Sequence, residues 1–441
     1  MPSFLSQLKT FFASLPPAAG LFLIGVFALP ISAVPAQIFL YASLLWWLID
    51  WWLQRGPDDW KTPLSKPVLC LLIVIVLSIF VSERPGYTAS KIYKGYLFLF
   101  VFAIPQWLSE KWFDRRAILY AFLGGISCLA VFDLIRSPIQ LGQGIAFQDL
   151  GNIRDPQFYM IALIFLSAMF LHQAVKPAQA VKPAQAVKPA QAAKSVQAVK
   201  PAQAAKSVQA VKPAQAVKPS NYRFGMPAWL WGTAFVLSSF GLLLHCKRGS
   251  MLALGVALLM LGLLTKRFKT VGILVLLGII VAGSIPQVRH RVMSLRDQFD
   301  PNFGGRLALW TQIAPPLIKD HPFGIGFRTS SWEDFLEYKK PNQHIEELNH
   351  LHNNLLQETA ELGWHGLVAW LWLAIAGLIA IWRRWRIEAS VSALAVLAAY
   401  IGLHANGMVE YNFGDLEILM LYCILLGAGN WPRFPQIRTV K

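Results

Sequence analysis

Charged residues are scarce in this chain of 441 residues. Asp, Glu, Lys and Arg make up 14% of the sequence, whereas a typical soluble domain contains about 25%. A soluble protein of this length would divide into two or three domains, and each would need a charged surface. Because hydrophobic residues reach 55% and the mean hydropathy is +0.47, the composition excludes a water-soluble globular protein.

Sequence patterns for metal and nucleotide binding are also lacking. The four cysteines, Cys70, Cys128, Cys246 and Cys423, lie in or beside apolar runs without C-x-x-C spacing. We therefore expect reduced, buried thiols. The chain has no G-x-x-x-x-G-K-[ST] phosphate loop and no G-x-G-x-x-G fingerprint, so no nucleotide cofactor is predicted.

Long uncharged apolar runs dominate what is present. A membrane-spanning helix needs about 20 apolar residues, with a range of about 17 to 25. Two such segments lie between Thr10 and Ile49, divided by Pro30 and Pro35. The others lie near residues 64–82, 92–108, 117–135, 157–173, 226–245, 250–265, 270–285, 363–382, 389–407 and 416–431. We predict an all-α, polytopic membrane protein with about 12 transmembrane helices.

The distribution of basic residues orients these helices. Cytoplasmic loops carry an excess of Lys and Arg, a rule that holds for loops of up to about 60 residues. With the N-terminus in the cytoplasm, the cytoplasmic connections hold 25 Lys and Arg, and the outer ones hold 7 when the long loop 286–353 is set aside. Both termini are therefore predicted to be cytoplasmic, and the long loop to lie on the outer face.

A low-complexity segment separates the sixth and seventh predicted helices. Between Ala174 and Ser220, Lys recurs every six residues, and five of the repeat units read Lys-Pro-Ala-Gln-Ala followed by Val or Ala. Regular prolines and like charges predict an extended, disordered cytoplasmic linker; contact with anionic lipid is an alternative. Its eight Lys account for much of the net charge of +17. The excess of basic residues thus reflects how the chain crosses the membrane, and no nucleic-acid partner is expected.

The predicted organisation therefore has five parts. They are helices one to six (1–173), the linker (174–224), helices seven to nine (225–285), the outer loop (286–362), and helices ten to twelve with a cytoplasmic tail (363–441). The outer loop contains five of the nine histidines together with acids and bases. Because long ordered loops on a rigid scaffold often carry function, the site is expected there.

The strongest local pattern in this loop runs from His350 to Gly366. Apolar residues follow at helical spacing, and Gly363 is a natural helix stop. His352 would lie at or near the first turn, where the helix dipole disfavours imidazolium, and a neutral imidazole suits a general base. The alternatives are a histidine that only caps or packs the loop, or a metal held by His344, His350 and His352.

Basic residues also gather at the predicted outer ends of helices. Arg248 lies between two spans with almost no loop, and Arg306 begins an amphipathic stretch. Others at these outer ends are Lys91, Lys94, Arg136 and Arg154. An Arg inside a membrane costs about 2.5–3.5 kcal/mol on insertion scales, so it usually has a partner or a function, although it can snorkel to the headgroups. Several cations facing a His-rich loop favour an anionic ligand such as phosphate.

These motifs resemble those of the O-antigen ligase and polymerase superfamily. The pair His352–Asn353, separated by nine residues from Gly-x-x-Gly at 363–366, resembles the superfamily signature. So do Arg248 after a span, Arg306 in a Gly-Arg-x-x-x-Trp segment, and a long outer loop that the His motif closes. The resemblance covers most of the chain except the repeat.

The resemblance implies an inverting glycosyl transfer at the periplasmic face of the bacterial inner membrane. The donor would be an undecaprenyl-diphosphate-linked glycan, and no metal or other cofactor would be required. His352 would deprotonate the acceptor hydroxyl, while Arg248 and Arg306 would bind the diphosphate as it leaves. The implied substrate-binding residues are Lys94, Lys91, Arg154 and Asn353.

Several functions remain open within and outside this superfamily. A ligase transfers the glycan to lipid A–core, a polymerase to another lipid-linked repeat, and a protein O-oligosaccharyltransferase to Ser or Thr. The segment His-Leu-His-Asn-Asn-Leu-Leu-Gln and the long loop are more similar to a ligase, which makes lipopolysaccharide biosynthesis the prediction. A polytopic transporter is the alternative outside the enzymes, and it would need paired ionisable residues near the bilayer midplane.

Overall fold

The computed structural model describes residues 15–54, 62–109, 115–143, 155–173, 228–245, 247–294, 305–339 and 349–430. Across these ranges the chain forms helices and no strands. The all-α prediction is thereby confirmed. The predicted linker and Arg154 lie outside the described residues, as do Cys246 and His344.

The first half of the chain forms a series of apolar helices. In chain order they are α2 (Pro17–Ala28), α3 (Ala33–Gln54), α4 (Ser65–Val81), α5 (Pro85–Lys91), the 3₁₀-helix η1 (Ile92–Leu99), α6 (Phe100–Ser109), α7 (Arg115–Gly142) and α8 (Asp155–Gln173). Pro17 and Pro85 each begin a helix, where the missing N–H of proline costs nothing.

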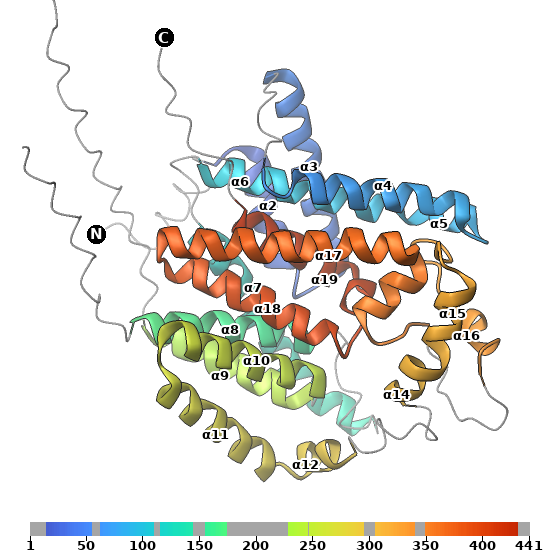
Figure 1. Ribbon diagram of the computed structural model, residues 1–441. Helices are drawn as coiled ribbons and strands as arrows, with labels where there is room; N and C mark the ends of the chain where they lie inside the picture. Colours follow the sequence, from blue (N-terminus) through green and yellow to red (C-terminus); the bar gives the residue numbers. More distant parts are fainter. Residues whose placement is uncertain are drawn as a thin grey trace, which may run out of the picture.

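The second half alternates long helices with a group of short ones. The long helices are α9 (Ala228–His245), α10 (Arg248–Thr265), α11 (Phe268–Ser284), α17 (Asn354–Glu388), α18 (Val391–Gly407) and α19 (Leu416–Gly429). The short ones are α12 (Pro286–Met293), α14 (Arg306–Ala308), the π-helix η3 (Leu309–Ile313), α15 (Ala314–Asp320), α16 (Trp332–Leu336) and the 3₁₀-helix η4 (Asn412–Gly414). Figure 1 shows the long helices side by side, with α12, α14, α15 and α16 gathered at one end.

Four of the described helices are long and apolar enough to cross a membrane. These spans are Ala33–Leu53, Arg115–Leu141, Arg248–Thr265 and Asn354–Glu388. Shorter apolar helices of 10–17 residues accompany them, among them α4, α18 and α19. This pattern agrees with a membrane protein of several passes, whereas the number of twelve spans and the orientation stay predictions.

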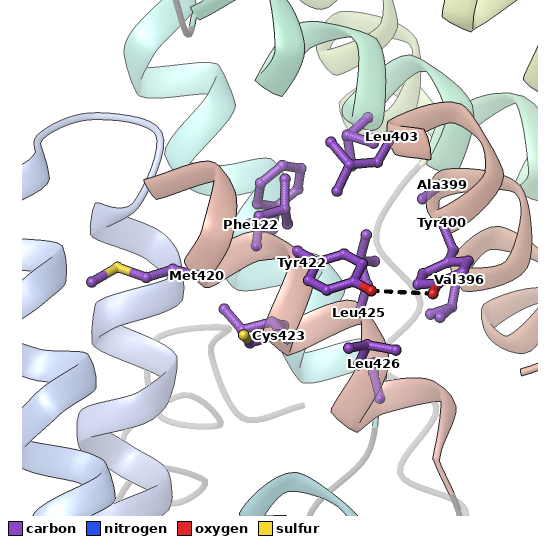
Figure 2. Packing of buried hydrophobic residues seen from close by; sticks show 14 of the residues in the cluster. Phe122, Val396, Ala399, Tyr400, Leu403, Met420, Tyr422, Cys423, Leu425 and Leu426 are labelled. Carbon is purple, nitrogen blue, oxygen red and sulfur yellow. Dashed lines mark hydrogen bonds between the residues drawn. The ribbon is translucent and has the colours of Figure 1, made fainter. Parts of the chain in front are cut away.

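The core lies where α8, α18 and α19 pack together. α19 is apolar apart from Glu417 in its first turn and is buried along its whole length, as expected for a helix at the centre of a bundle. Tyr422 of α19 and Tyr400 of α18 bring their hydroxyl oxygens to 3.4 Å, as Figure 2 shows. Tyr400 also donates a hydrogen bond to the Ala374 carbonyl of α17 (2.9 Å). These contacts fix α17 against the core helices that carry it.

α17 contains a break that positions the polar end of the molecule. Gly363 has the non-helical angles φ 71° and ψ −173°, and the Trp364 N–H donates to the Pro322 carbonyl across the break (3.1 Å). A Cβ at Gly363 would lie 2.5 Å from that carbonyl oxygen, so only glycine fits. The expected helix stop at Gly363 is therefore a kink, after which the helix resumes. The segment 354–362 before the kink leads to the His motif.

Candidate functional site

The start of α17 is fixed by a helix cap. The Asn353 side-chain oxygen accepts hydrogen bonds from the N–H groups of Leu355 (2.9 Å) and Leu356 (3.2 Å). Its Nδ2 donates to the Met408 carbonyl after α18 (2.9 Å). Asn is among the preferred N-cap residues because it satisfies otherwise unpaired helix N–H groups. The amide predicted to bind substrate thus joins the start of α17 to the end of α18.

His352 lies directly before this cap with a left-handed backbone, φ 48°. Such a conformation costs a non-glycine residue about 1–3 kcal/mol, so neighbouring contacts must hold it. The His352 N–H donates to His350 Nδ1 (3.4 Å), and the Trp310 indole N–H donates to the Leu351 carbonyl (2.8 Å). His352 therefore has a fixed backbone and lies two residues before Asn354, the first residue of α17.

The His352 ring meets a carboxylate that the sequence analysis did not select. His352 Nδ1 lies 3.0 Å from Glu410 Oε2. An ionised carboxylate can only accept, so Nδ1 carries the proton and Nε2 keeps its lone pair. This tautomer leaves Nε2 able to accept a proton, as a general base must.

The other carboxylate oxygen of Glu410 binds Arg306. Arg306 is the first residue of α14, and its Nη2 donates to Glu410 Oε1. Arg306 Nε is buried and makes no hydrogen bond among the described residues. One carboxylate therefore joins two residues predicted to be catalytic, and the guanidinium keeps a donor for an anionic ligand.

The charge of Glu410 is stabilised by these partners. Burial alone would raise the pKa of its carboxyl group, but the hydrogen bond from His352 and the guanidinium of Arg306 outweigh burial and hold the pKa below its usual value. Glu410 is therefore ionised at neutral pH.

Arg248 begins α10 beside the same carboxylate. Its Nη1 donates to Ser294 Oγ after α12 (3.2 Å). The next residue, Gly249, packs against Glu410 so closely that a Cβ there would lie 3.1 Å from Glu410 Cγ. The structure thus brings Arg306 and His352 together on Glu410, and the start of α10, which carries Arg248, packs beside this carboxylate.

His350 supports His352 and carries no charge of its own. The two rings meet edge to face with centroids 4.2 Å apart. Burial, with smaller effects from the nearby His352 and Arg306, lowers the pKa of His350 to about 4. His350 is therefore neutral at physiological pH, and replacing it would disturb His352 directly. His321, which lies 3.8 Å from Glu83, is a more independent histidine.

One known protein family matches the part of the chain that contains these residues. Residues 233–371 match the O-antigen ligase family. This segment is similar to the O-antigen ligase domain. The resemblance to the O-antigen ligase and polymerase superfamily is thereby confirmed for this part of the chain. No individual curated protein matches the chain. The matched segment contains Arg248, Arg306 and His352, whereas Glu410 lies beyond its end.

A second polar network adjoins this site through Tyr411. The buried Arg328 donates from Nη1 to the Tyr411 hydroxyl (2.7 Å) and from its backbone N–H to Glu361 (2.8 Å). Gln357 Nε2 donates to the same Glu361 carboxylate (2.7 Å). This network holds the loop 322–330 against the segment of α17 before the kink.

The predicted lysines lie beside this second network. Lys94 in η1 is within electrostatic range of Arg328, Glu361 and Asp415. Lys91, at the end of α5, holds its ammonium 4.5 Å from the centroid of the Tyr87 ring. Among the described residues, Glu410 and His352 contact neither lysine, so the role of the lysines in binding substrate stays a prediction.

A separate cluster of potential metal ligands lies between α7, α8 and α9. Ligand atoms of Asp133, Asp155 and His245 lie within 4.8 Å of one another. Arg136 Nη2, however, lies 2.5 Å from Asp133 Oδ1 and 3.3 Å from Asp155 Oδ2. A guanidinium therefore already supplies the positive charge that a metal ion would bring.

Sequence reasoning missed Glu410 and Arg328. Glu410 falls in the short connection between α18 and α19, on the face predicted to be outer. The available signal was electrostatic, because buried cations need a compensating anion. Arg328 follows directly after the Gly-rich stretch 322–327, which reads Pro-Phe-Gly-Ile-Gly-Phe.

The cap geometry separates two roles for Asn353. Asn353→Ser keeps an N-cap acceptor, whereas Asn353→Ala loses it and should lower the free energy of unfolding by about 0.5–2 kcal/mol. If Asn353 acts only as a cap, the Ser variant should retain near-normal donor affinity and thermal midpoint. A Ser variant that is stable but no longer binds donor would instead show that the amide contacts substrate.

Proposed function

We propose that the chain is an inverting O-antigen ligase that transfers glycan from undecaprenyl diphosphate to lipid A–core. The reaction takes place at the periplasmic face of the inner membrane. The observation that supports this most strongly is the meeting of His352 and Arg306 on one carboxylate, beside Arg248. All three residues fall in the matched O-antigen ligase domain.

His352 supplies the base in this proposal. Its Nε2 takes the proton from the acceptor hydroxyl as the oxygen attacks the anomeric carbon. The bond from that carbon to the diphosphate oxygen breaks, and its electron pair stays on the diphosphate. Attack from the face opposite the leaving group inverts the anomeric configuration. The products are glycosylated acceptor, undecaprenyl diphosphate and an imidazolium that returns its proton to solvent or to the diphosphate.

Arg248 and Arg306 stabilise the leaving group. The diphosphate gains negative charge as the bond breaks, and fixed guanidinium groups stabilise that charge without reorganisation. Planar guanidinium donors match pairs of phosphate oxygens. With both cations supplied by the chain, the proposed reaction uses no metal ion and no nucleotide sugar.

An acceptor panel tests the proposed function. The purified full-length protein, with lipid-linked glycan and excess chelator, is offered lipid A–core, a second lipid-linked repeat, or a Ser/Thr peptide. Transfer to lipid A–core alone is expected. Elongation of the second repeat would identify a polymerase instead, and glycosylation of the peptide an oligosaccharyltransferase. Full loss of transfer in chelator, restored by a divalent ion, would contradict the metal-free mechanism.

Substitutions test the assigned roles. His352→Ala should lower kcat by about 10²–10⁴-fold, the usual contribution of a general base, with little change in donor affinity. Arg248→Lys and Arg306→Lys keep the charge but lose the planar fork, so each should be nearly as impaired as the Ala variant. Transfer rates and donor affinity are measured on protein extracted from membranes at equal abundance.

His321→Ala is the matched control, since its histidine lies away from Glu410. It should transfer glycan at the wild-type rate. The roles are wrong if His352→Ala transfers normally, or if the Lys variants are fully active.

A further inference from the structure

Backbone hydrogen bonds on both sides of Glu410 fix its position in the connection between α18 and α19. Its own N–H donates to the Asn406 carbonyl at the end of α18 (2.9 Å). On the other side of it, the Asn412 N–H donates to the Asn354 side chain in the first turn of α17 (2.9 Å). The connection 408–412 is thus clamped between two long helices, and the carboxylate has little freedom to follow its partners.

The groups around Glu410 come from three different elements. The loop before α17 contributes His352 and His350, and α14 contributes Arg306. α10 contributes Gly249, with the charged Arg248 one residue away. Each carboxylate oxygen has one of the reacting groups as its partner: Oε2 has the imidazole and Oε1 has the guanidinium.

We propose that Glu410 is a positioning residue that fixes the tautomer of His352 and, through its second oxygen, the place of Arg306. The inference rests on the proposed function. In an inverting transfer the base and the leaving group lie on opposite sides of the anomeric carbon. The rigid Glu410 carboxylate holds the base by one oxygen and the cation for the leaving group by the other. It therefore sets the distance between base and cation, and the reaction rate depends steeply on such positioning.

The two-sided contact makes Glu410→Gln a sharp test. Arg306 has only donors, so the Gln amide oxygen must face Arg306 and its NH₂ must face His352. The NH₂ then donates to Nδ1, which places the ring proton on Nε2 and removes the base. Although the side chain keeps its shape, kcat should fall by about 10²-fold or more. Donor affinity should change less than about threefold, because Arg306 keeps its charge.

The pH profile gives a readout that a purely structural role would not change. Protonation of His352 stops catalysis, and the Glu410 carboxylate favours the imidazolium. Because Glu410→Gln removes the charge beside the imidazole, the acid limb of its kcat profile should move to lower pH. Glu410→Asp keeps the charge on a shorter side chain; its acid limb should stay near that of the wild type while kcat falls.

Glu337→Gln is the matched control, because Glu337 is exposed at the end of α16 on the same side of the molecule. It should leave rate and pH profile unchanged. If Glu410→Gln shows wild-type kcat and an unmoved acid limb while His352→Ala is inactive, the positioning role is wrong and the base assignment stands. If His352→Ala itself remains active, the proposed function is wrong in its choice of base, whatever Glu410→Gln shows. A third outcome is that kcat falls equally in Glu410→Gln and Glu410→Asp, with unmoved acid limbs and lower thermal midpoints. In that case Glu410 has only a structural role.

Discussion

The carboxylate of Glu410 is the point on which the site depends. It accepts one hydrogen bond from His352 and one from Arg306, and the start of α10 packs against its side chain. A largely buried anion is tolerated only when cations and donors compensate its lost hydration, and removing one partner leaves an uncompensated charge. Residues from α10, α14, the loop before α17 and the connection after α18 must therefore be in place together.

The helices around the site supply the fixed positions that this arrangement needs. The kink at Gly363 directs the first part of α17 toward the short helices at one end of the bundle, as Figure 1 shows. The Asn353 cap then sets where the chain leaves α17, and the left-handed backbone at His352 turns its ring toward Glu410. Backbone strain held by such contacts is common at functional sites.

Local sequence signals predicted much of the fold, because apolar run length and helix stops are local properties. The break at Gly363 and the starts of α10 and α14 near Arg248 and Arg306 are examples. The pairing of Arg306 with Glu410 depends on how distant segments pack, which no local pattern records. Asn353 could have been recognised as an N-cap from its position before an apolar helix. Instead, the resemblance to the superfamily signature led to the prediction that Asn353 binds substrate.

The central claim is that this chain joins a lipid-linked glycan to lipid A–core, with His352 as its base. The most direct measurement is the lipopolysaccharide ladder of a deletion strain complemented with the wild type or with His352→Ala. The account predicts core alone in the deletion strain, a full ladder with the wild type, and core alone with His352→Ala at equal abundance in the membrane. A deletion strain that shows core plus one repeat, or an unchanged ladder, would contradict it.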